Sequence, residues 1–491
     1  MSALSQLEAQ LPPRVLITDP ARTEKYRWDW SRDASAGVPL AVVRARTAEH
    51  VQIAVRWAAA NHVPITTRGA GTGLSGGSSA IDGGLVVSLE EMVGIEIDAA
   101  SQVAIVEPGA LNKCVKVSAA EHGLWYPPDP SSYEICSIGG NVATNAGGLC
   151  CVKYGVTTDY VLGLDVVLAD GTLVKLGGKR IKDVAGLSLV KLFVGSEGTL
   201  GIVTRAVLRL IPLQGARSTL VATFASVEAA ANAVVAIRRS CRPSMLELMD
   251  RPSINAVEDY RPMGLDRNAG AMLVVQCDAP GPARQAEVAI VEAACSEALE
   301  VFVTDDAEEG EAFVSARRLV FDAVDCRGSL FFEDVGVPVP RLPELLAAVA
   351  GIAERYDLEI PVVAHAGDGN THPLVVYDAT DPGSSKRAKE AFAAIMQAAI
   401  ALEGTITGEH GVGRAKRSAL PDQLGPDVMA LSLKIKKALD PDGVFQPGCD
   451  VRGVRAKVGA LPMENLRFPC EVSHGKRKFH RVPGETNTRF G

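Results

Sequence analysis

Three of the eight histidines lie close together near the C-terminal end, each among glycines. His365 and His372 enclose the run Ala-Gly-Asp-Gly-Asn-Thr, while Glu409 and His410 lie in Gly-Glu-His-Gly-Val-Gly. An Asp-Gly turn between two apolar stretches can fold both imidazoles of the first pair toward one point. Two imidazoles and a carboxylate form a common ligand set for a divalent metal ion, and Glu409 is the nearest suitable third ligand. For the first pair alone, a structural hairpin with incidental histidines is the simpler interpretation.

The 47 glycines are clustered rather than scattered, with groups in 68–84, 137–148 and 195–201. Gly71 to Gly76 matches the G-x-G-x-x-G pattern of nicotinamide-binding folds, which requires a helix to begin there. Residues 74–84 are too rich in Gly and Ser for that helix, and the next strand begins by Leu85, so the pattern misleads. A single cluster would be read as a plain turn. Three of them could enclose one extended cofactor, because successive unshielded N–H groups bind phosphate oxygens.

Hydrophobic periodicity places these clusters in an α+β region that ends near Pro212. We expect strands at 40–43, 63–67, 85–88, 103–106, 161–168 and 201–211, and helices at 47–61 and 110–122. A second pattern follows, with strands at 219–224, near Met245, at 271–277 and at 301–303, and helices at 227–239 and 283–298. This order is typical of a ferredoxin-like layer. Further helices are expected at 308–321, 342–356, 384–401 and 426–439.

Composition limits the class of protein. The 491 residues are 47% hydrophobic and carry a net charge of −8, which fits a globular protein and argues against a nucleic-acid binder. The longest apolar stretches, 345–353 and 391–402, are too short for a transmembrane helix. The first residues lack a basic-then-apolar leader, and the ten cysteines include no CxxC pair. We therefore expect a cytoplasmic protein with reduced thiols and no iron–sulfur cluster built on CxxC spacing within this chain.

Five motifs together resemble the FAD-binding domain of the vanillyl-alcohol oxidase/p-cresol methylhydroxylase superfamily. They are Arg68-Gly-Ala-Gly-Thr-Gly-Leu-Ser-Gly-Gly77, Pro127-Pro-Asp-Pro-Ser-Ser132, Cys136-Ser-Ile-Gly-Gly-Asn-Val-Ala-Thr-Asn-Ala-Gly-Gly148, Lys153-Tyr-Gly155 and Gly195-Ser-Glu-Gly-Thr-Leu-Gly201. Their order over about residues 14–449 is similar to that of FAD-linked 2-hydroxy acid dehydrogenases, the group of bacterial glycolate oxidase and D-lactate dehydrogenase.

The resemblance implies an α+β fold. Residues 1–36 would be an N-terminal segment and 37–213 a p-cresol methylhydroxylase-type FAD-binding domain. Residues 214–449 would be a ferredoxin-like substrate (cap) domain with a C-terminal helical segment, and 450–491 a peripheral tail.

It also implies the contacts of the FAD. The first loop would hold the pyrophosphate, the second cluster the flavin and ribityl portions, and the third the adenosine half. The implied cofactor residues are Arg68, Gly69, Ala70, Gly71, Thr72, Gly73, Ser75, Pro128, Asp129, Ser137, Gly140, Asn141, Thr144, Gly148, Glu197 and Ile202. Some relatives attach the flavin covalently through a His of the first loop. Thr72 stands there in this chain, so we expect a non-covalent flavin.

The C-terminal motifs resemble the HxGDGNxH and GEHG signature of the same enzymes. On that resemblance His365, His372 and Glu409 bind a divalent ion, Zn, Mn or Fe, and His410 is the catalytic base. Arg317, in Phe313-Val-Ser-Ala-Arg-Arg318, would hold the substrate carboxylate, with a solvated helix arginine as the alternative. Relatives that act on longer dicarboxylates carry a hydroxyl and a Lys where this chain has Phe321 and Asp334, which favours a small monocarboxylic substrate.

The predicted reaction is oxidation of a small D-2-hydroxy acid, glycolate or D-lactate, to the 2-oxo acid. Hydride would pass to flavin N5, and electrons would leave to a partner iron–sulfur subunit, a cytochrome or a quinone. The protein would be cytoplasmic or peripheral at the inner face of the membrane. An oxygen-using oxidase and a D-2-hydroxyglutarate-type dehydrogenase remain alternatives. A non-catalytic flavoprotein subunit is disfavoured, since such a subunit should lack the metal and GEHG elements.

Overall fold

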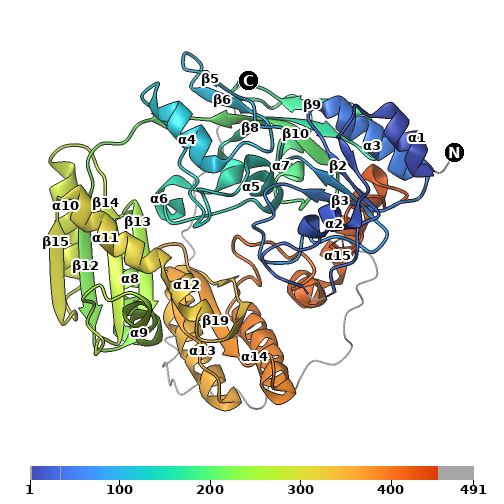
Figure 1. Cartoon of the computed structure of the whole chain (residues 1–491). Coiled ribbons are helices and arrows are strands. Elements are labelled where there is room, and N and C mark those ends of the chain that lie inside the picture. The colour runs from blue at the N-terminus through green and yellow to red at the C-terminus, as the bar shows by residue number, and fades with distance from the viewer. Residues whose placement is uncertain (1–2, 34, 450, 452–491) are drawn as a thin grey trace, which may run out of the picture. The chain divides into compact units, whose positions relative to one another are not determined.

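Two β-sheets form the N-terminal part of the structure, a computed structural model that describes residues 3–33, 35–449 and 451 (Figure 1). The first has the order β1 (Leu16–Ile17), β2 (Ala41–Arg44), β4 (Leu85–Ser88) and β3 (Ile65–Arg68), with β2, β4 and β3 parallel. Helix α3 (Ala48–Ala60) connects β2 to β3 and begins as expected at Thr47, whose hydroxyl caps the amide of His50. The second sheet is antiparallel, with the order β5 (Ile95–Asp98), β6 (Val103–Val106), β10 (Ile202–Arg209), β8 (Val161–Val167) and β9 (Leu173–Gly177).

Short helices and turns complete this part. They are α1 (Ala3–Gln10), α2 (Pro20–Thr23), η1 (Glu24–Tyr26), α4 (Asn112–Ala120), α5 (Ile138–Thr144), α6 (Cys151–Tyr154), η2 (Thr157–Asp159) and α7 (Leu189–Phe193). A two-stranded pair, β7 (Leu124–Trp125) and β11 (Ile211–Pro212), lies beside them. The first glycine cluster contains no helix, as predicted. The second does contain one, α5, which the hydrophobic pattern does not predict.

The C-terminal part is built on one long sheet. Its first four strands are β12 (Ser218–Phe224), β13 (Met245–Asp250), β14 (Ala271–Cys277) and β15 (Glu300–Thr304), in the spatial order β15-β12-β14-β13. With α8 (Val227–Ser240) and α10 (Ala283–Ala294) this is the predicted ferredoxin-like arrangement. The sheet continues through β18 (Val362–His365), β19 (Asn370–Tyr377) and β16 (Ser329–Phe332), and β17 (Val335–Gly336) also pairs with β19.

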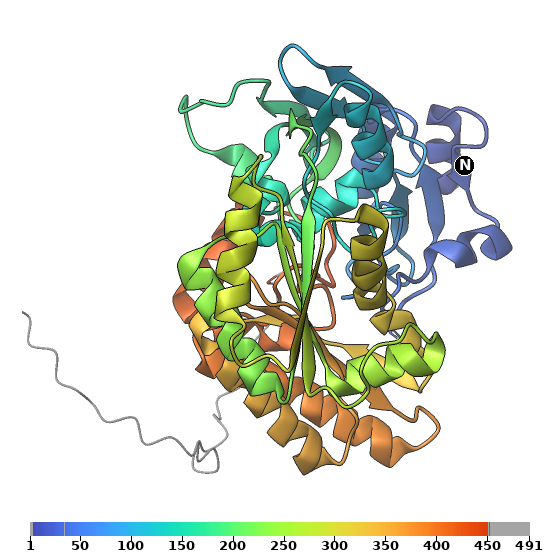
Figure 2. The same cartoon turned by 90° about the vertical axis from the view of Figure 1, so that its left-hand side faces the viewer.

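Helices cover both faces of this sheet (Figure 2). Neighbouring residues of β12 show which helices cover each face, because successive side chains of a strand point to opposite faces of the sheet. Leu220 belongs to one buried cluster with residues of α8, α10, α13 (Leu342–Tyr356) and α14 (Pro382–Ala401). Val221 belongs to another, with residues of α9 (Arg251–Tyr260), α11 (Ala307–Arg318) and α12 (Val320–Asp325). Helix α9 is absent from the sequence-based expectations. The turns η3 (Val339–Arg341) and η4 (Arg417–Ala419) precede α13 and α15.

The end of the described chain returns to the N-terminal part. Helix α15 (Leu420–Leu439) is kinked at Gly425, and beyond its end the chain runs beside β3. There the amide of Ile65 donates to Val444 and the amide of Gln446 donates to Ile65, at 2.7 and 2.9 Å. Residues 3–449 therefore fold as one unit, and the α+β prediction is confirmed. The expected tail at 450–491 lies outside the described residues, apart from Val451.

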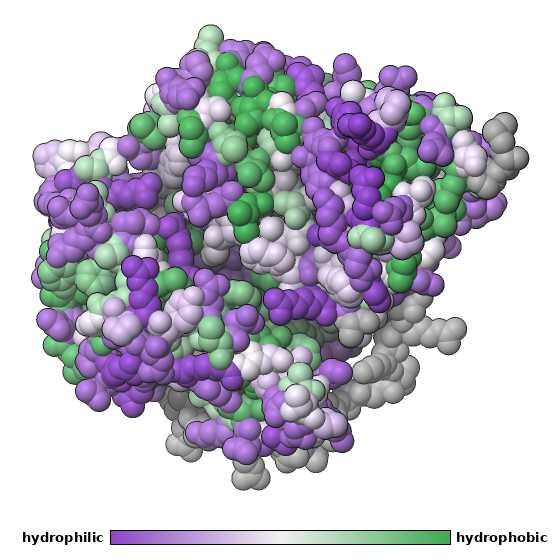
Figure 3. Space-filling view, viewed as in Figure 1, coloured by the Kyte–Doolittle hydropathy of each residue, from purple (hydrophilic) through white to green (hydrophobic). Residues whose placement is uncertain are grey.

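Hydrophilic residues cover most of the face shown in Figure 3, which is hollowed near its middle. None of the described helices is both long enough and apolar enough to cross a membrane.

Candidate active site

A cavity of about 390 Å³ is lined by residues of both the N-terminal and the C-terminal part of the fold. Its N-terminal wall consists of the glycine-rich segments, and its C-terminal wall carries the arginine, histidine and glutamate side chains singled out in the sequence. The predicted residues that line it are Gly69, Ala70, Gly71, Thr72, Gly73, Ser75, Ser137, Gly140, Asn141, Thr144, Glu197, Arg317, His372, Glu409 and His410. Residues far apart in the sequence thus meet around one space.

The first loop is fixed against the start of α5. The Ser137 hydroxyl accepts hydrogen bonds from the amides of Ala70 and Gly140, at 3.2 and 3.4 Å. A Cβ at Gly69 would lie 2.3 Å from this hydroxyl, so only glycine permits the contact. Gly69, Gly71 and Gly73 of this loop line the cavity without a side chain, which suits close approach of a phosphate-bearing cofactor.

Six predicted site residues lie behind the cavity wall. The Arg68 guanidinium packs under the loop near Gly71, and Asp129 accepts a hydrogen bond from the amide of Cys150. Ile202 is fully buried in the core of the first sheet. Pro128 and Gly148 likewise do not line the cavity, and His365 is covered by the side chains in front of it. These positions shape the cavity from behind.

The histidine pair lies on the β18–β19 hairpin, as its spacing predicted. Register pairs Val363 with His372 and His365 with Asn370, so all four side chains project from one face of the sheet. Gly369 makes the turn possible, because its φ is +85° and a Cβ there would lie 2.1 Å from the Val337 carbonyl oxygen. Both imidazoles face Glu409, with His365 Nε2 at 3.1 Å and His372 Nε2 at 3.2 Å from Glu409 Oε1.

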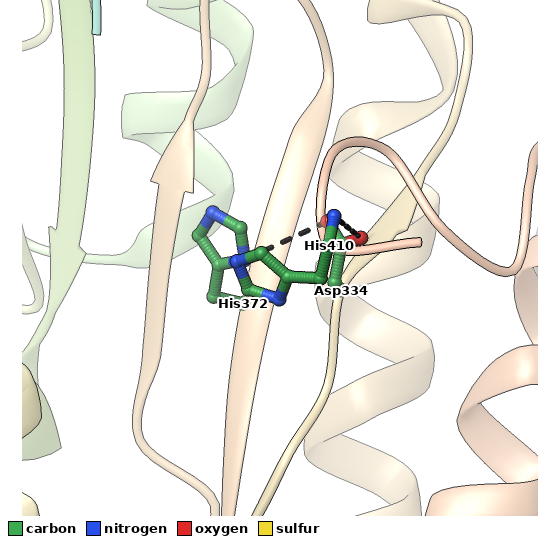
Figure 4. A group of neighbouring side chains, drawn as sticks. All are labelled: Asp334, His372 and His410. Atoms are coloured by element: carbon green, nitrogen blue, oxygen red, sulfur yellow. Dashed lines mark hydrogen bonds and ion pairs between the residues drawn. The ribbon is translucent and has the colours of Figure 1, made fainter. Parts of the chain in front are cut away.

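Each histidine of the hairpin has a buried carboxylate behind it. Both oxygens of Glu247, on β13, lie 2.9 Å from His365 Nδ1. Asp334 Oδ1 lies 3.8 Å from His372 Nδ1, and Figure 4 shows Asp334 beside the stacked rings of His372 and His410. Glu247 thus fixes the ring of His365, the usual arrangement of a histidine that binds a metal, whereas His372 Nδ1 and Asp334 Oδ1 are too far apart for a hydrogen bond.

Asp334 also holds the Gly-Glu-His-Gly loop. Its Oδ2 accepts hydrogen bonds from the amides of Gly408, Glu409 and His410, at 2.8, 3.0 and 2.9 Å. The Thr407 hydroxyl donates a fourth bond to the same oxygen, at 2.6 Å. Burial raises the pKa of the Asp334 carboxyl, but the charges of the surrounding histidine and lysine side chains lower it by more, so that it lies below its usual value.

The N-terminal part holds the same loop from the other side. Glu197 accepts hydrogen bonds from the amides of Val412 and Gly413, at 2.8 and 2.7 Å, and the Ser75 hydroxyl donates to the carbonyl oxygen of His410, at 3.0 Å. Position 197 was expected near the adenosine. In the structure its carboxylate lines the cavity and binds the loop that carries the predicted base.

Arg317 projects from the end of α11 into the cavity wall. Only 6% of its side chain is exposed, and its Nε lies 3.0 Å from Glu247 Oε2. Its Nη2 is buried and has no hydrogen-bond partner among the described residues. A buried guanidinium with an unused edge is suited to a carboxylate ligand.

Two phenylalanines form an apolar wall beside these groups. Phe332 lies 5.0 Å from the ring of His410 and 5.6 Å from that of His372, between ring centroids. Phe321 lies 5.2 Å from Phe332, and both line the cavity. The polar end of the cavity is therefore narrowed by aromatic rings.

Burial controls the protonation of His410. It lowers the pKa of this imidazole to about 4, although the nearby Asp334 carboxylate acts in the opposite direction. His410 is therefore neutral at physiological pH, the form that can accept a proton.

The sequence comparisons agree with this arrangement. Residues 39–177 match the family described as "FAD binding domain", and residues 213–449 match "FAD linked oxidases, C-terminal domain". The glycolate oxidase subunit GlcD of Bacillus subtilis (strain 168) is 40% identical over 416 residues, covering 84% of this chain and 88% of that protein. The chain belongs to this family of FAD-linked oxidases. It is an oxidoreductase with an FAD-binding domain.

Other relatives have related names. The GlcD subunit of Escherichia coli (strain K12) is 36% identical over 438 residues, covering 88% of each chain. A D-lactate dehydrogenase of Archaeoglobus fulgidus is 35% identical over 438 residues, covering 88% of this chain and 96% of that protein. Among solved structures, p-cresol methylhydroxylase superposes with a TM-score of 0.77 at 18% identity, covering 91% of this chain and 96% of the other. The predicted fold is confirmed.

Sequence reasoning missed the side chains that support the predicted ones. Glu247 lies within Met-Leu-Glu-Leu-Met-Asp, a strand that is buried throughout, and an acidic residue in such a strand is a sign of a paired or functional group. Lys416 is buried and donates to Glu333 and to the carbonyl oxygens of Asp334 and Ile406, each at 2.7 Å. The sequence around Lys416 and Glu333 carries no comparable signal.

Proposed function

We propose that this FAD-linked oxidase oxidises a small 2-hydroxy acid, glycolate or D-lactate, to the corresponding 2-oxo acid. The observation that carries the proposal is the position of Arg317, His410 and Glu409 in the wall of the cavity that the cofactor loop also lines. A group for a carboxylate, a neutral base and a potential metal ligand thus share one space with the flavin-binding segments.

The residues divide the chemistry among them. Arg317 binds the substrate carboxylate through its unpaired edge and so fixes the α-carbon. His410, neutral because it is buried, takes the proton of the substrate hydroxyl. FAD, when bound, supplies the acceptor for the hydride that leaves the α-carbon. The aromatic wall excludes water from the reacting groups.

We also propose a divalent ion, Zn, Mn or Fe, held by His365, His372 and Glu409. Two ligands about 2.1 Å from one ion, at tetrahedral or octahedral angles, are roughly 3.0–3.4 Å apart. The two Nε2–Oε1 separations of 3.1 and 3.2 Å fit that range. The hydrogen bonds between Glu247 and His365 Nδ1 fit as well. When bound, an ion supplies positive charge that lowers the pKa of the substrate hydroxyl.

Direct ion pairs between protonated imidazoles and Glu409 would produce similar distances, so elemental analysis must decide. We expect about one divalent ion per chain, and loss of both ion and activity in His372→Ala with FAD retained. His122→Ala, which removes an exposed histidine, is the control. Full activity without metal, or metal retained in His372→Ala, would overturn the proposed ligand set.

The walls of the cavity favour a small monocarboxylic substrate. Phe321 and Phe332 occupy the space beside His372 and His410. Asp334 cannot bind a second carboxylate, since it is buried, anionic and already accepts four hydrogen bonds. A 2-hydroxyglutarate-type substrate would leave its distal carboxylate facing phenyl rings, which is costly.

We propose a non-oxygen electron acceptor: a partner iron–sulfur subunit, a cytochrome or a quinone. A substrate screen with an artificial dye should show reduction with glycolate or D-lactate, slower reduction with L-lactate, and little with 2-hydroxyglutarate. Under air, without dye, the reduced flavin should persist and little peroxide should form. Rapid peroxide production would instead identify an oxygen-using oxidase. Failure of every 2-hydroxy acid to bleach the flavin would overturn the proposed substrate class.

A further inference from the structure

The connection between β9 and α7 exposes large apolar side chains. It extends away from the body at the upper left of Figure 2. Ile181 is 73% exposed, Val184 98% and Leu187 85%, the three highest values among the large apolar side chains of the described residues. No residue between 178 and 189 lines the cavity of the candidate active site. Exposing these apolar side chains to water is unfavourable, and they do not contribute to the active-site cavity.

The same segment is basic in an acidic protein. Residues 173–191 contain Lys175, Lys179, Arg180, Lys182 and Lys191 against the single acidic residue Asp183, whereas the whole chain has a net charge of −8. Two of these cations are paired, Lys179 with Asp98 and Arg180 with Asp183. Among the described residues, Lys182 and Lys191 form no ion pair. Within residues 178–189 three basic residues stand against Asp183, so the segment that carries the apolar tips has a net positive charge.

We propose that this segment, residues 178–189, docks the enzyme on an anionic membrane surface. Apolar side chains that project singly from a loop, with Lys182 between them and Lys179 and Arg180 just before them, can enter the interface while the cations meet lipid phosphates. Long basic side chains can also direct their charges to the headgroups while their stems lie in the apolar region. A protein partner would more usually meet a continuous packed patch than separate projecting tips.

The sequence of the segment fits this role. Gly178 and Gly186 both have positive φ, 154° and 83°, and no α-helix or β-strand lies between β9 and α7. The apolar residues at 181, 184 and 187 recur every third position and stand apart from one another along the projecting chain. Binding should therefore need both parts, the apolar tips for insertion and the cations for attraction to anionic lipid.

Vesicle sedimentation with the full-length holoenzyme tests the proposal. Vesicles of equal parts phosphatidylglycerol and phosphatidylcholine should bring the protein down at low salt, and pure phosphatidylcholine should not. Raising the salt to about 0.5 M should weaken binding several-fold, because the Debye length shrinks. Ile181→Ser/Val184→Ser/Leu187→Ser should weaken it by at least about thirtyfold, since one buried aliphatic side chain is worth about tenfold.

Matched variants distinguish the segment from general surface effects. Lys182→Gln/Lys191→Gln should weaken binding several-fold, whereas Lys386→Gln/Lys389→Gln on α14 should not. Val428→Ser/Leu431→Ser, which alters exposed apolar residues of α15, is the apolar control. Dye-linked activity without vesicles should stay within about twofold in all of them, so the outcome does not depend on the proposed substrate.

Three results would overturn the proposal. The first is a wild-type protein that does not sediment with anionic vesicles, and the second is a triple-serine variant that binds them as well as the wild type. The third is a concentration-dependent dimer that the triple-serine variant abolishes, without vesicle binding, which would assign the segment to an interface between copies of the chain.

Discussion

Replacing Arg317 by alanine should raise KM for the 2-hydroxy acid far more than it lowers kcat. The side chain is 6% exposed, so its contact with a substrate carboxylate is desolvated. Losing one partner of a desolvated charge pair costs about 2–5 kcal/mol, which corresponds to roughly 30-fold to several-thousand-fold. Because the same contact exists in ground and transition states, most of the loss falls on KM. Arg317→Lys should recover only part, since a point charge cannot replace the planar fork.

The structure adds a second expected effect of this change. Arg317 also faces Glu247, and its removal leaves that buried carboxylate with the imidazole of His365 as its only remaining side-chain partner among the described residues. Breaking a buried pair costs about 3–5 kcal/mol, and His365 should keep the loss of unfolding free energy at the lower end. Urea unfolding and flavin content must therefore be measured beside the kinetics. A KM effect at full flavin occupancy separates substrate binding from folding.

Arg318 provides the matched control. It lines the same cavity but is 30% exposed and pairs with Glu311 at 2.8 Å, so Arg318→Ala should change KM less than about threefold. If Arg317→Ala left KM within a few-fold while Arg318→Ala raised it strongly, the carboxylate would be bound at Arg318 and the reasoning would be refuted. Arg341 pairs with Glu344 and does not line the cavity, so we do not expect it to bind the substrate carboxylate.

Three further predictions concern the flavin, the base and a buried carboxylate. Acid precipitation should release all the FAD, because Thr72 offers no covalent link; flavin that stays in the pellet would contradict this. His410→Ala should lower kcat by about 10²–10⁴-fold with little change in KM and with FAD and metal content intact, and a large KM effect would argue against a base. Asp250 caps α9 and accepts a hydrogen bond from the amide of Val362, and burial raises its pKa to about 6. The folded state therefore loses stability as the pH rises from about 4 to 6 and this carboxyl must ionise. Asp250→Asn lacks that loss, so its unfolding free energy relative to wild type should increase by up to about 3 kcal/mol over that range. Parallel stability curves would exclude this assignment.

Sequence periodicity located most elements of the fold because its physical basis is local. The strand at 271–277 and the helix at 342–356 have the predicted bounds, since each has a continuous apolar run or face. Helix α5 was missed because Ile-Gly-Gly-Asn-Val-Ala-Thr has a poor intrinsic propensity, and its start is fixed by Ser137 and by contact with the first loop. Tertiary contacts that no local pattern encodes decide such segments.

The candidate active site likewise contains some residues that local sequence predicts and others that only tertiary contacts place. The histidine hairpin could be predicted from two apolar runs around an Asp-Gly turn, and most of the site residues expected from the motifs line the cavity. Glu247 and Asp334 could not be placed, because each acts on a histidine more than thirty positions away. Glu247 reaches His365 through the pairing of β13 with β18, and Asp334 reaches His372 from the connection between β16 and β17. A single sequence specifies neither contact.

The loop that carries His410 is bonded to both parts of the chain, which has a consequence for engineering. Consider a hybrid enzyme that takes its cofactor-binding part from one relative and its substrate part from another. In it, the contacts of Ser75 and Glu197 with residues 410–413 would join residues from two different parents. Each parent must then contribute compatible residues at both ends of these bonds, or the imidazole will be misplaced in a well-folded hybrid. Transplanting residues 75, 197 and 407–413 as one set should therefore rescue hybrids that bind flavin but do not turn over.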